Sequence, residues 1–262
     1  MPGFAELKHA FDKLELIGRP VIAHASLKKF GEIQGGPKTV IQALLASTSG
    51  LIMPTFTYKT MITPNIGPPN NGLTYGSNKD KNKMAEPFRA DMPPDKMMGA
   101  LSLALFQQKD VLRTSHPILS FAGIQANEIL LAQTLFDPLA PIRELAARDG
   151  WVVLINVDHS VNTSIHYGEK LAGRRQFIRW ALTPERIVEC PGFPGDSSGF
   201  NAIEAYIAPN TLRVEMGDGA FIQAIPLKRL LNATVELIKR DPLALLCQRS
   251  DCQRCNAVRN TI

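Results

Sequence analysis

An apolar strand followed closely by a capped helix is the feature that most constrains this fold. The run Trp151–Ile155 is apolar throughout, as in a strand that is covered on both faces of a sheet. Asn162 and Thr163 suit a helix start, because their side chains accept hydrogen bonds from the free N–H groups of a first turn. The pattern predicts a strand over 151–157, a helix over 163–171 and a protein of the α/β class.

His166 and Glu169 stand three residues apart in that predicted helix, so they share one face. An imidazole titrates near neutral pH and can take a proton from an amine or from water. A carboxylate at this spacing can orient the ring and stabilise its charged form. A half-exposed histidine with a routine helix partner explains the same spacing. The pair is a candidate acid–base site at the mouth of an α/β sheet.

Predicted strands and helices alternate along the rest of the chain as well. Helical spacing is predicted over 4–17, 37–45, 95–107, 126–134, 141–147, 200–207 and 227–239. Strands or extended segments are predicted over 20–25, 51–57, 177–182 and 187–189, with a hairpin over 212–225. Alternating strands and helices favour a three-layer α/β/α sandwich, and no linker divides residues 1–262, so we expect a single domain.

Residues 58–94 interrupt this alternation. The segment is rich in Pro, Gly and Asn and has almost no periodic apolar pattern. A loop of this length inside a compact chain is usually functional or mobile. We interpret it as a flap over a site, and a surface excursion is the alternative.

Composition narrows the function classes. The 262 residues carry a net charge of +5 spread along the chain, which suits an anionic ligand such as a phosphate-bearing cofactor. No dense basic stripe or known motif supports a nucleic-acid partner. No apolar run is long enough to cross a bilayer, and Met1–His9 does not resemble a signal peptide. A cytoplasmic protein without a membrane partner is the expectation; the oligomeric state stays open, with a homodimer as one option.

The four cysteines are unevenly placed. Cys247, Cys252 and Cys255 crowd the C-terminal tail as C-x4-C-x2-C, and Cys190 stands alone. In a cytoplasmic chain such spacing suggests metal ligation rather than disulfides. Cys190 would complete a four-thiolate structural zinc site if its loop folds onto the tail. Reduced thiols without a metal are the alternative.

Two further motifs carry polar side chains on irregular backbone. His24–Lys28 and the glycines Gly35 and Gly36 lie between a predicted strand and a predicted helix, where backbone N–H groups can meet a phosphate. Arg113–Pro117 combines a cation, two hydroxyls and an imidazole, and such a group can hold a phosphate or a carbonyl. Glycines needed only for turns and a hydrogen-bonded structural turn are the respective alternatives.

Taken in order, these motifs resemble the aminoglycoside 3-N-acetyltransferase family over roughly residues 20–175. The motifs that carry the resemblance are His24-x-Ser26-Leu27 with Gly31 and Gly35-Gly36, Met53–Thr57, Met92-Pro93 with Gly99-Ala100, Arg113-x-Ser115-His116-Pro117, Ser120–Gly123, and Asn162-Thr163-x-x-His166-x-x-Glu169.

The resemblance implies the α/β/α fold of the antibiotic N-acetyltransferases and acetyl-CoA as the co-substrate. It implies that His166 is the general base, that Glu169 orients it, and that the amine attacks the thioester directly. Backbone N–H groups and the Thr163 hydroxyl would stabilise the oxyanion. The implied CoA-binding residues are His24, Ser26, Leu27, Lys28, Gly35, Gly36, Arg113 and Ser115.

The residues before the Asn-Thr pair depart from the family. Ser160 stands where an acidic residue is expected, and Asp158 stands where glycine is common. Asp158 and Asn162 are therefore the candidate acceptor-binding residues. The acceptor implied by the resemblance is the 3-amino group of an aminoglycoside. The departure and the positive net charge leave two alternatives open, namely an N-acyltransferase for another amine and a non-catalytic CoA-binding relative.

Overall fold

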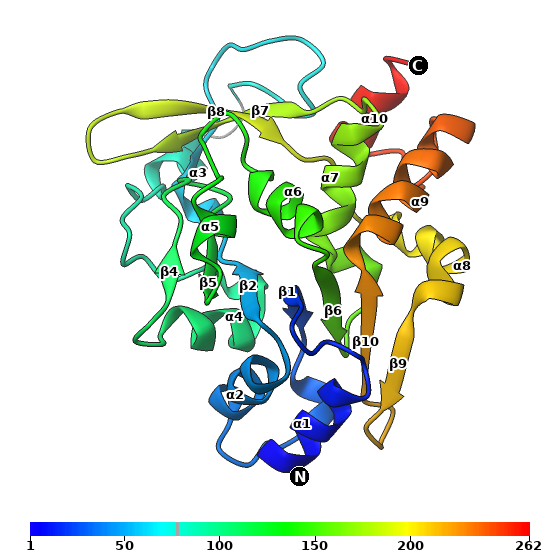
Figure 1. Ribbon diagram of the computed structural model, residues 1–262. Coiled ribbons are helices and arrows are strands. Elements are labelled where there is room, and N and C mark those ends of the chain that lie inside the picture. Colours follow the sequence, from blue (N-terminus) through cyan, green and yellow to red (C-terminus); the bar gives the residue numbers. More distant parts are fainter. Residues whose placement is uncertain (77–78) are drawn as a thin grey trace.

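A seven-stranded sheet runs through the middle of the molecule (Figure 1), in a computed structural model that describes residues 1–76 and 79–262. Its order is β4 (Leu112–Arg113), β5 (Phe121–Ile124), β2 (Gly50–Pro54), β1 (Pro20–Ala25), β6 (Trp151–Ile155), β10 (Phe221–Pro226) and β9 (Leu212–Glu215). The three central strands β2, β1 and β6 are parallel, and the outer pairings are antiparallel. The hairpin predicted over 212–225 is confirmed as β9 and β10.

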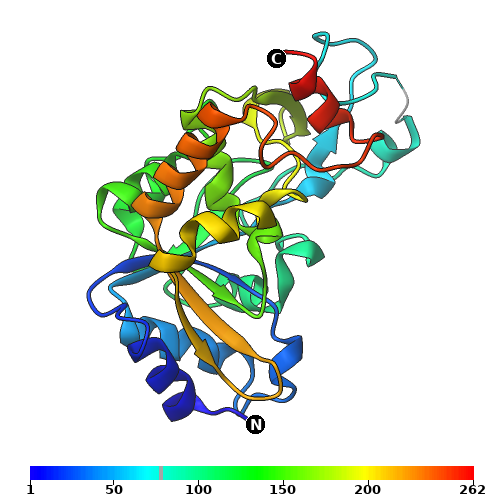
Figure 2. The same ribbon diagram turned by 90° about the vertical axis from the view of Figure 1, so that its right-hand side faces the viewer.

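Helices cover both faces of this sheet (Figure 2). One face packs on α1 (Phe4–Asp12), α2 (Pro37–Ser47) and α4 (Gly99–Phe106). The other face packs on α5 (Asn127–Leu130), α6 (Ala140–Ala147), α7 (Thr163–Leu171) and α9 (Leu227–Arg240). Along β6, Val153 belongs to the first core, and Val152 and Leu154 belong to the second. Because β6 is buried on both faces, its sequence is apolar throughout, and the predicted α/β/α sandwich is confirmed.

The parallel strands end at a common edge. Ser26, directly after β1, donates from its backbone to the carbonyl of Ile155 at the end of β6 (2.9 Å). The loop after β6 leads through a 3-10 turn, His159–Val161, into α7. In α/β proteins the carboxyl ends of parallel strands are the usual place for a ligand site, and here this edge carries His24 and the loop that holds Asp158.

A second, smaller sheet was not predicted. It consists of β3 (Met61–Ile62), β7 (Phe177–Leu182) and β8 (Ile187–Phe193), and a short C-terminal helix, α10 (Gln253–Arg259), lies beside it. The described part of the 58–94 segment is tied to both. Asn71 exchanges two hydrogen bonds with the backbone of Ile178 (2.8 and 3.0 Å), and Asn70 donates to the carbonyl of Ala257 (3.0 Å). The flap function of this segment stays a prediction; its residues 77–78 lie outside the described residues.

Several predicted elements are shorter in the structure. The first helix ends at Asp12, because Glu15 takes a left-handed backbone (φ 55°), which ends an α-helix, although Leu14 and Leu16 remain buried. The strand predicted over 51–57 ends at Pro54. The remaining helices are α3 (Lys79–Lys83) and α8 (Glu204–Ile207). Across the described residues, no helix combines the length and apolar character that a membrane crossing requires.

Candidate active site

Helix α7 begins where its sequence predicts. Asn162 is the N-cap, and its side-chain oxygen accepts a hydrogen bond from the backbone of Ser164 (3.1 Å). All residues from Thr163 to Glu169 are buried, and α7 packs against α9 and α6 on one face of the sheet. At the contact with α9, a Cβ on Gly168 would lie 2.7 Å from the side chain of Thr234, so the two helices require glycine here. His166 is thereby held near the start of a buried helix.

His166, Glu169 and Arg174 form a continuous chain of hydrogen bonds. Nδ1 of His166 lies 2.8 Å from Oε2 of Glu169, and the other Glu169 oxygen accepts from Arg174 (2.8 Å). Arg174 also donates to the carbonyls of Pro242 (2.8 Å) and Ala244 (2.7 Å). His166 and Arg174 are each 8 % exposed and Glu169 is 1 % exposed. Because an ionised carboxylate can only accept, this pairing places the imidazole hydrogen on Nδ1.

Nε2 of His166 is the atom left for chemistry. Among the described residues no hydrogen bond uses it. The ring packs edge-on against Phe200, with centroids 4.7 Å apart, and Phe200 is fully buried. An imidazole that is held at Nδ1 and open at Nε2 is arranged to accept a proton at Nε2.

Asp158 is hydrogen-bonded to the residue that follows Phe200 in the sequence. Its carboxylate accepts from Asn201 (2.9 Å), the residue after Phe200, and from the backbone of Ser160 (3.0 Å). Burial raises the pKa of Asp158, but the hydrogen bonds from Ser160 and Asn201 outweigh it and hold the pKa below its ordinary value. Asp158 therefore carries a negative charge next to Ser160, the position where the resemblance expects an acid.

Two further buried histidines lie near each other, one on β1 and one in the 3-10 turn before α7. His24, on β1, is 7 % exposed and its Nε2 has no partner among the described residues. Burial lowers its pKa to about 3, and the nearby His159 lowers it further. His159 is also buried, and its Nδ1 lies 3.3 Å from the Asn162 side-chain nitrogen. Both rings are therefore neutral, and Asn162 connects His159 to the start of α7.

The side chain of Arg113 binds other parts of the protein. Its guanidinium lies 5.5 Å from the ring of Phe88 and 4.9 Å from that of Phe106. It donates to one hydroxyl and three backbone carbonyls, those of Ser120, Thr55, Ala90 and Met92. Burial lowers its pKa to about 10. These hydrogen bonds show that Arg113 fastens the segment around Ala90 and Met92 to the sheet, and its predicted contact with CoA stays a prediction.

His116 has a structural role in the adjacent turn. Its Nδ1 accepts from the backbones of Ile118 (3.1 Å) and Leu119 (2.9 Å), and the ring is 4 % exposed. Burial lowers its pKa to about 4. The neighbouring Ser115 is exposed.

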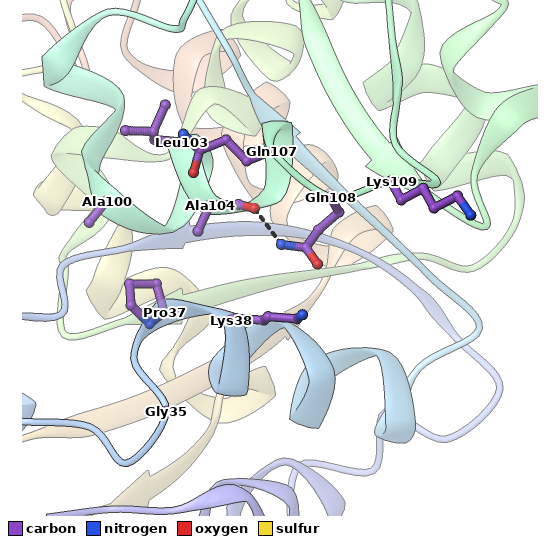
Figure 3. Close-up of a pocket in the computed structure, with 9 residues that line it drawn as sticks. All are labelled: Gly35, Pro37, Lys38, Ala100, Leu103, Ala104, Gln107, Gln108 and Lys109. Carbon is purple, nitrogen blue, oxygen red and sulfur yellow. Dashed lines mark hydrogen bonds between the residues drawn. The ribbon is translucent and has the colours of Figure 1, made fainter.

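The glycines predicted to bind CoA lie at the start of α2. Gly35 and Gly36 have φ values of 78° and 69°, which favour glycine, and Pro37 begins the helix. A pocket of about 670 Å³ lies between α2 and α4 (Figure 3). Its lining residues are Gly35, Pro37, Lys38, Ala100, Leu103, Ala104, Gln107, Gln108 and Lys109.

Of the residues predicted to bind CoA, Gly35 alone belongs to that lining. Ser26 and Leu27 are half-buried and Lys28 is exposed at the end of β1, outside it. The predictions missed Lys38 and Lys109, although Lys38 directly follows the glycine-proline turn. They also missed Arg174 and Phe200, whose positions in the sequence carry no signal of a site.

The predicted four-cysteine set is wrong. Cys190 lies in β8, where its sulfur contacts the carbonyl of Val188 (3.9 Å) and burial raises its pKa to about 12. The ligand atoms of Cys247, Cys252 and Cys255 instead gather with a carboxylate oxygen of Asp196, all within 4.8 Å of one another. Among the described residues, Cys190 is not one of the ligands in this group, although it is buried in the same core as the tail cysteines.

The sequence is similar to a family of known proteins. The family model described as aminoglycoside 3-N-acetyltransferase matches residues 22–239. Aminoglycoside N(3)-acetyltransferase IV from Salmonella sp is 25% identical over 183 residues, which cover 63% of this chain and 61% of that protein. The match therefore spans less than two thirds of that relative's length.

Solved structures agree in fold. A mutant of aminoglycoside acetyltransferase AAC(3)-IVa in complex with a gentamicin has a TM-score of 0.77 and 22% identity, with 100% of this chain and 98% of that one covered. The binary complex of AAC-IIIb with CoASH has a TM-score of 0.72 and 18% identity, with 91% and 97% covered. Since the family model covers well over half of the chain, this protein belongs to the aminoglycoside 3-N-acetyltransferase family.

Proposed function

We propose that this protein is an acetyl-CoA-dependent N-acetyltransferase that uses His166 as general base, with the 3-amino group of an aminoglycoside as the first candidate acceptor. The observation that carries the proposal is the buried chain His166–Glu169–Arg174, which leaves Nε2 of the imidazole free. A ring held this way accepts a proton without losing its orientation. Membership of the family supports the reaction class.

The reaction follows from this arrangement. Acetyl-CoA supplies an activated acyl group, and the amine nitrogen forms a C–N bond to its carbonyl carbon. Nε2 of His166 takes the proton that the amine loses, and Glu169 stabilises the resulting imidazolium. The C–S bond then breaks, and the proton passes to the departing thiolate. No cysteine nucleophile is needed.

The start of α7 suits the transient oxyanion. Its first-turn N–H groups and the Thr163 hydroxyl are the proposed donors, since a helix N-terminus favours negative charge. The hydroxyl of Ser164 is buried and has no partner among the described residues. Thr163 is 7 % exposed, so a donor here would act in a site largely shielded from water.

The pocket between α2 and α4 is the proposed site for the phosphate-bearing end of CoA. Lys38 and Lys109 supply positive charge, and Gly35 lies where α2 begins (Figure 3). The structure of AAC-IIIb with CoASH supports CoA as a ligand of this fold. His24, Ser26, Leu27 and Lys28 remain proposed contacts for the rest of CoA, at the end of β1 nearer to α7.

Asp158 and Asn162 are the proposed acceptor-binding residues. The carboxylate of Asp158 would attract a cationic amine. Two contacts support this proposal: Asp158 accepts from Asn201, and Phe200, the residue before Asn201, packs against the His166 ring. The gentamicin complex of AAC(3)-IVa supports an aminoglycoside as the acceptor class. Because Ser160 stands where the resemblance expects an acidic residue, an amine other than an aminoglycoside is the second candidate acceptor.

The test is release of CoA, followed with a thiol reagent, from purified protein given acetyl-CoA and a panel of amines. Turnover with gentamicin-like or kanamycin-like amines is the expected result. Turnover only with other amines would contradict the proposed aminoglycoside acceptor but would support the proposed N-acetyltransferase reaction. CoA binding without turnover of any amine, unchanged by His166→Ala, would indicate a non-catalytic relative.

A further inference from the structure

Three cysteine sulfurs and one carboxylate meet next to the C-terminal helix. We propose that Cys247, Cys252, Cys255 and Asp196 bind one structural Zn²⁺ ion. Their four ligand atoms lie within 4.8 Å of one another. A tetrahedral site with Zn–S bonds of about 2.3 Å has ligands about 3.8 Å apart, so a small contraction closes the cluster around the ion. Each of the four residues is at most 8 % exposed.

The backbone presents the sulfurs as a zinc site requires. Cys252 is the N-cap of α10 and Cys255 lies in its first turn, which brings a C-x2-C pair to one side of the helix. Two side chains of α10 hold the loop that carries Cys247: Arg259 donates to the carbonyl of Cys247, and Asn256 donates to the carbonyl of Ser250 (2.6 Å). Hydrogen bonds around a metal site orient its ligands in this way.

The charges of the cluster balance once a divalent cation is present. Three thiolates and the Asp196 carboxylate carry four negative charges. Arg249 and Arg254 lie 3.2 and 3.3 Å from that carboxylate and supply two positive charges. Zn²⁺ supplies the other two. Thiolates are soft ligands that favour zinc over magnesium or calcium.

An access path to the cluster is present. A cavity of about 270 Å³ is lined by Asp196, Cys252 and both arginines. On binding, each coordinating thiol loses its proton to solvent as its sulfur binds the ion, and no oxidant is required.

The position of the cluster links it to the candidate active site. A Cβ on Gly195, the residue before Asp196, would lie 3.9 Å from Oε2 of Glu169. The carbonyl of Ala244, three residues before Cys247, holds Arg174. The ion would fasten both segments that surround the Glu169–Arg174 pair, a consequence that rests on the proposed function, whereas the zinc itself does not.

Metal content tests the proposal directly. Full-length protein purified from zinc-supplemented medium is expected to hold about one zinc per chain by mass spectrometry. The zinc should leave on treatment with a mercurial thiol reagent, and cobalt exchange should give the visible absorption of a tetrahedral thiolate site. Cys252→Ser and Cys255→Ser should each lower zinc content at least tenfold, and Asp196→Asn should speed its loss to a chelator. Cys190→Ser is the matched control and should keep its zinc.

Two results would overturn the site. One is folded protein without zinc whose tail thiols react freely with a thiol reagent and give no cobalt spectrum. The other is a disulfide within the tail under native conditions. If the cysteine variants do not fold, the zinc content and cobalt spectrum of the unmodified chain decide alone. These readouts need no amine or CoA, so failure of the zinc site and failure of the proposed reaction are distinguishable.

Discussion

Nδ1 of His166 lies 2.8 Å from Oε2 of Glu169, one helical turn further along a buried helix. Arg174 holds the second oxygen of the same carboxylate at 2.8 Å, so Glu169 is fixed from both sides. A carboxylate that is 1 % exposed and held by an arginine keeps its orientation toward the imidazole. The relationship makes His166 the proposed base and Glu169 its positioning residue.

Replacing His166 separates catalysis from binding. His166→Ala should lower kcat about 10²-fold or more, because the proton acceptor is removed. CoA affinity and the thermal midpoint should change little. Glu169→Gln should lower kcat by a smaller factor than His166→Ala. It should also move the acidic limb of the pH–rate profile to lower pH, because the imidazolium loses the negative charge beside it. A near-normal kcat for His166→Ala would contradict the assignment of the base.

Removing Arg174 tests the buried charge pair. Arg174→Ala leaves the Glu169 carboxylate buried without its partner and should cost about 3–5 kcal/mol of unfolding free energy. The control is Arg148→Ala, which breaks a more exposed pair with Glu128 (2.6 Å) and should cost less than about 1 kcal/mol. Urea unfolding measures both. An equal loss of unfolding free energy in the two variants would contradict the expectation that the buried pair is the costlier one to break.

Asp158 should govern recognition of cationic acceptors. Asp158→Asn keeps the size of the side chain and removes the charge, so KM for a polycationic amine should rise about tenfold with kcat little changed. The control is Asp149→Asn, at the opposite end of β6. Initial rates over a range of amine concentrations give both constants. An unchanged KM would place the acceptor elsewhere.

Lys38 should contribute to CoA affinity through charge alone. Lys38→Ala removes a cation from the pocket between α2 and α4 and should weaken CoA binding several-fold at low salt, less at high salt. Calorimetric titration at two ionic strengths measures this. Lys239→Ala, on α9 and outside that pocket, is the control. Equal effects of the two substitutions would move the phosphate site away from α2.

His116 should make the fold acid-sensitive. Its folded pKa of about 4 lies below the ordinary value of 6.5, so between these values the unfolded chain binds more protons than the folded one. Unfolding free energy therefore falls as pH drops from 6.5 toward 4, by up to about 1.4 kcal/mol per pH unit.

His116→Asn keeps an acceptor for the backbones of Ile118 and Leu119 and removes the titration. It should flatten the fall of unfolding free energy in this pH range, as measured by urea unfolding at several pH values. The exposed His9→Asn should leave the slope unchanged. A slope unaffected by His116→Asn would assign the acid sensitivity to other groups.

Local physics explains which elements were predictable. Strands β1 and β6 and helices α7 and α9 have continuous apolar runs, strong caps or amphipathic spacing, and the structure confirms each within one or two residues. The short β4 and β5 were not predicted, because they pair only through contacts with β2 that are distant in sequence. Helix α10 was missed for a similar reason, since its short turn is held by contacts with the 58–94 segment.

The candidate site divides in the same way. By itself, the sequence determined that His166 and Glu169 share a helix face after a buried strand, because helical periodicity and capping act over a few residues. Only the tertiary structure decided that Arg174 binds the second oxygen of Glu169. It also decided that Arg113 donates to backbone carbonyls, and that Asp196 rather than Cys190 lies beside the tail cysteines. These pairings join residues from separate segments, and packing of the two sheets and their helices determines which of them meet.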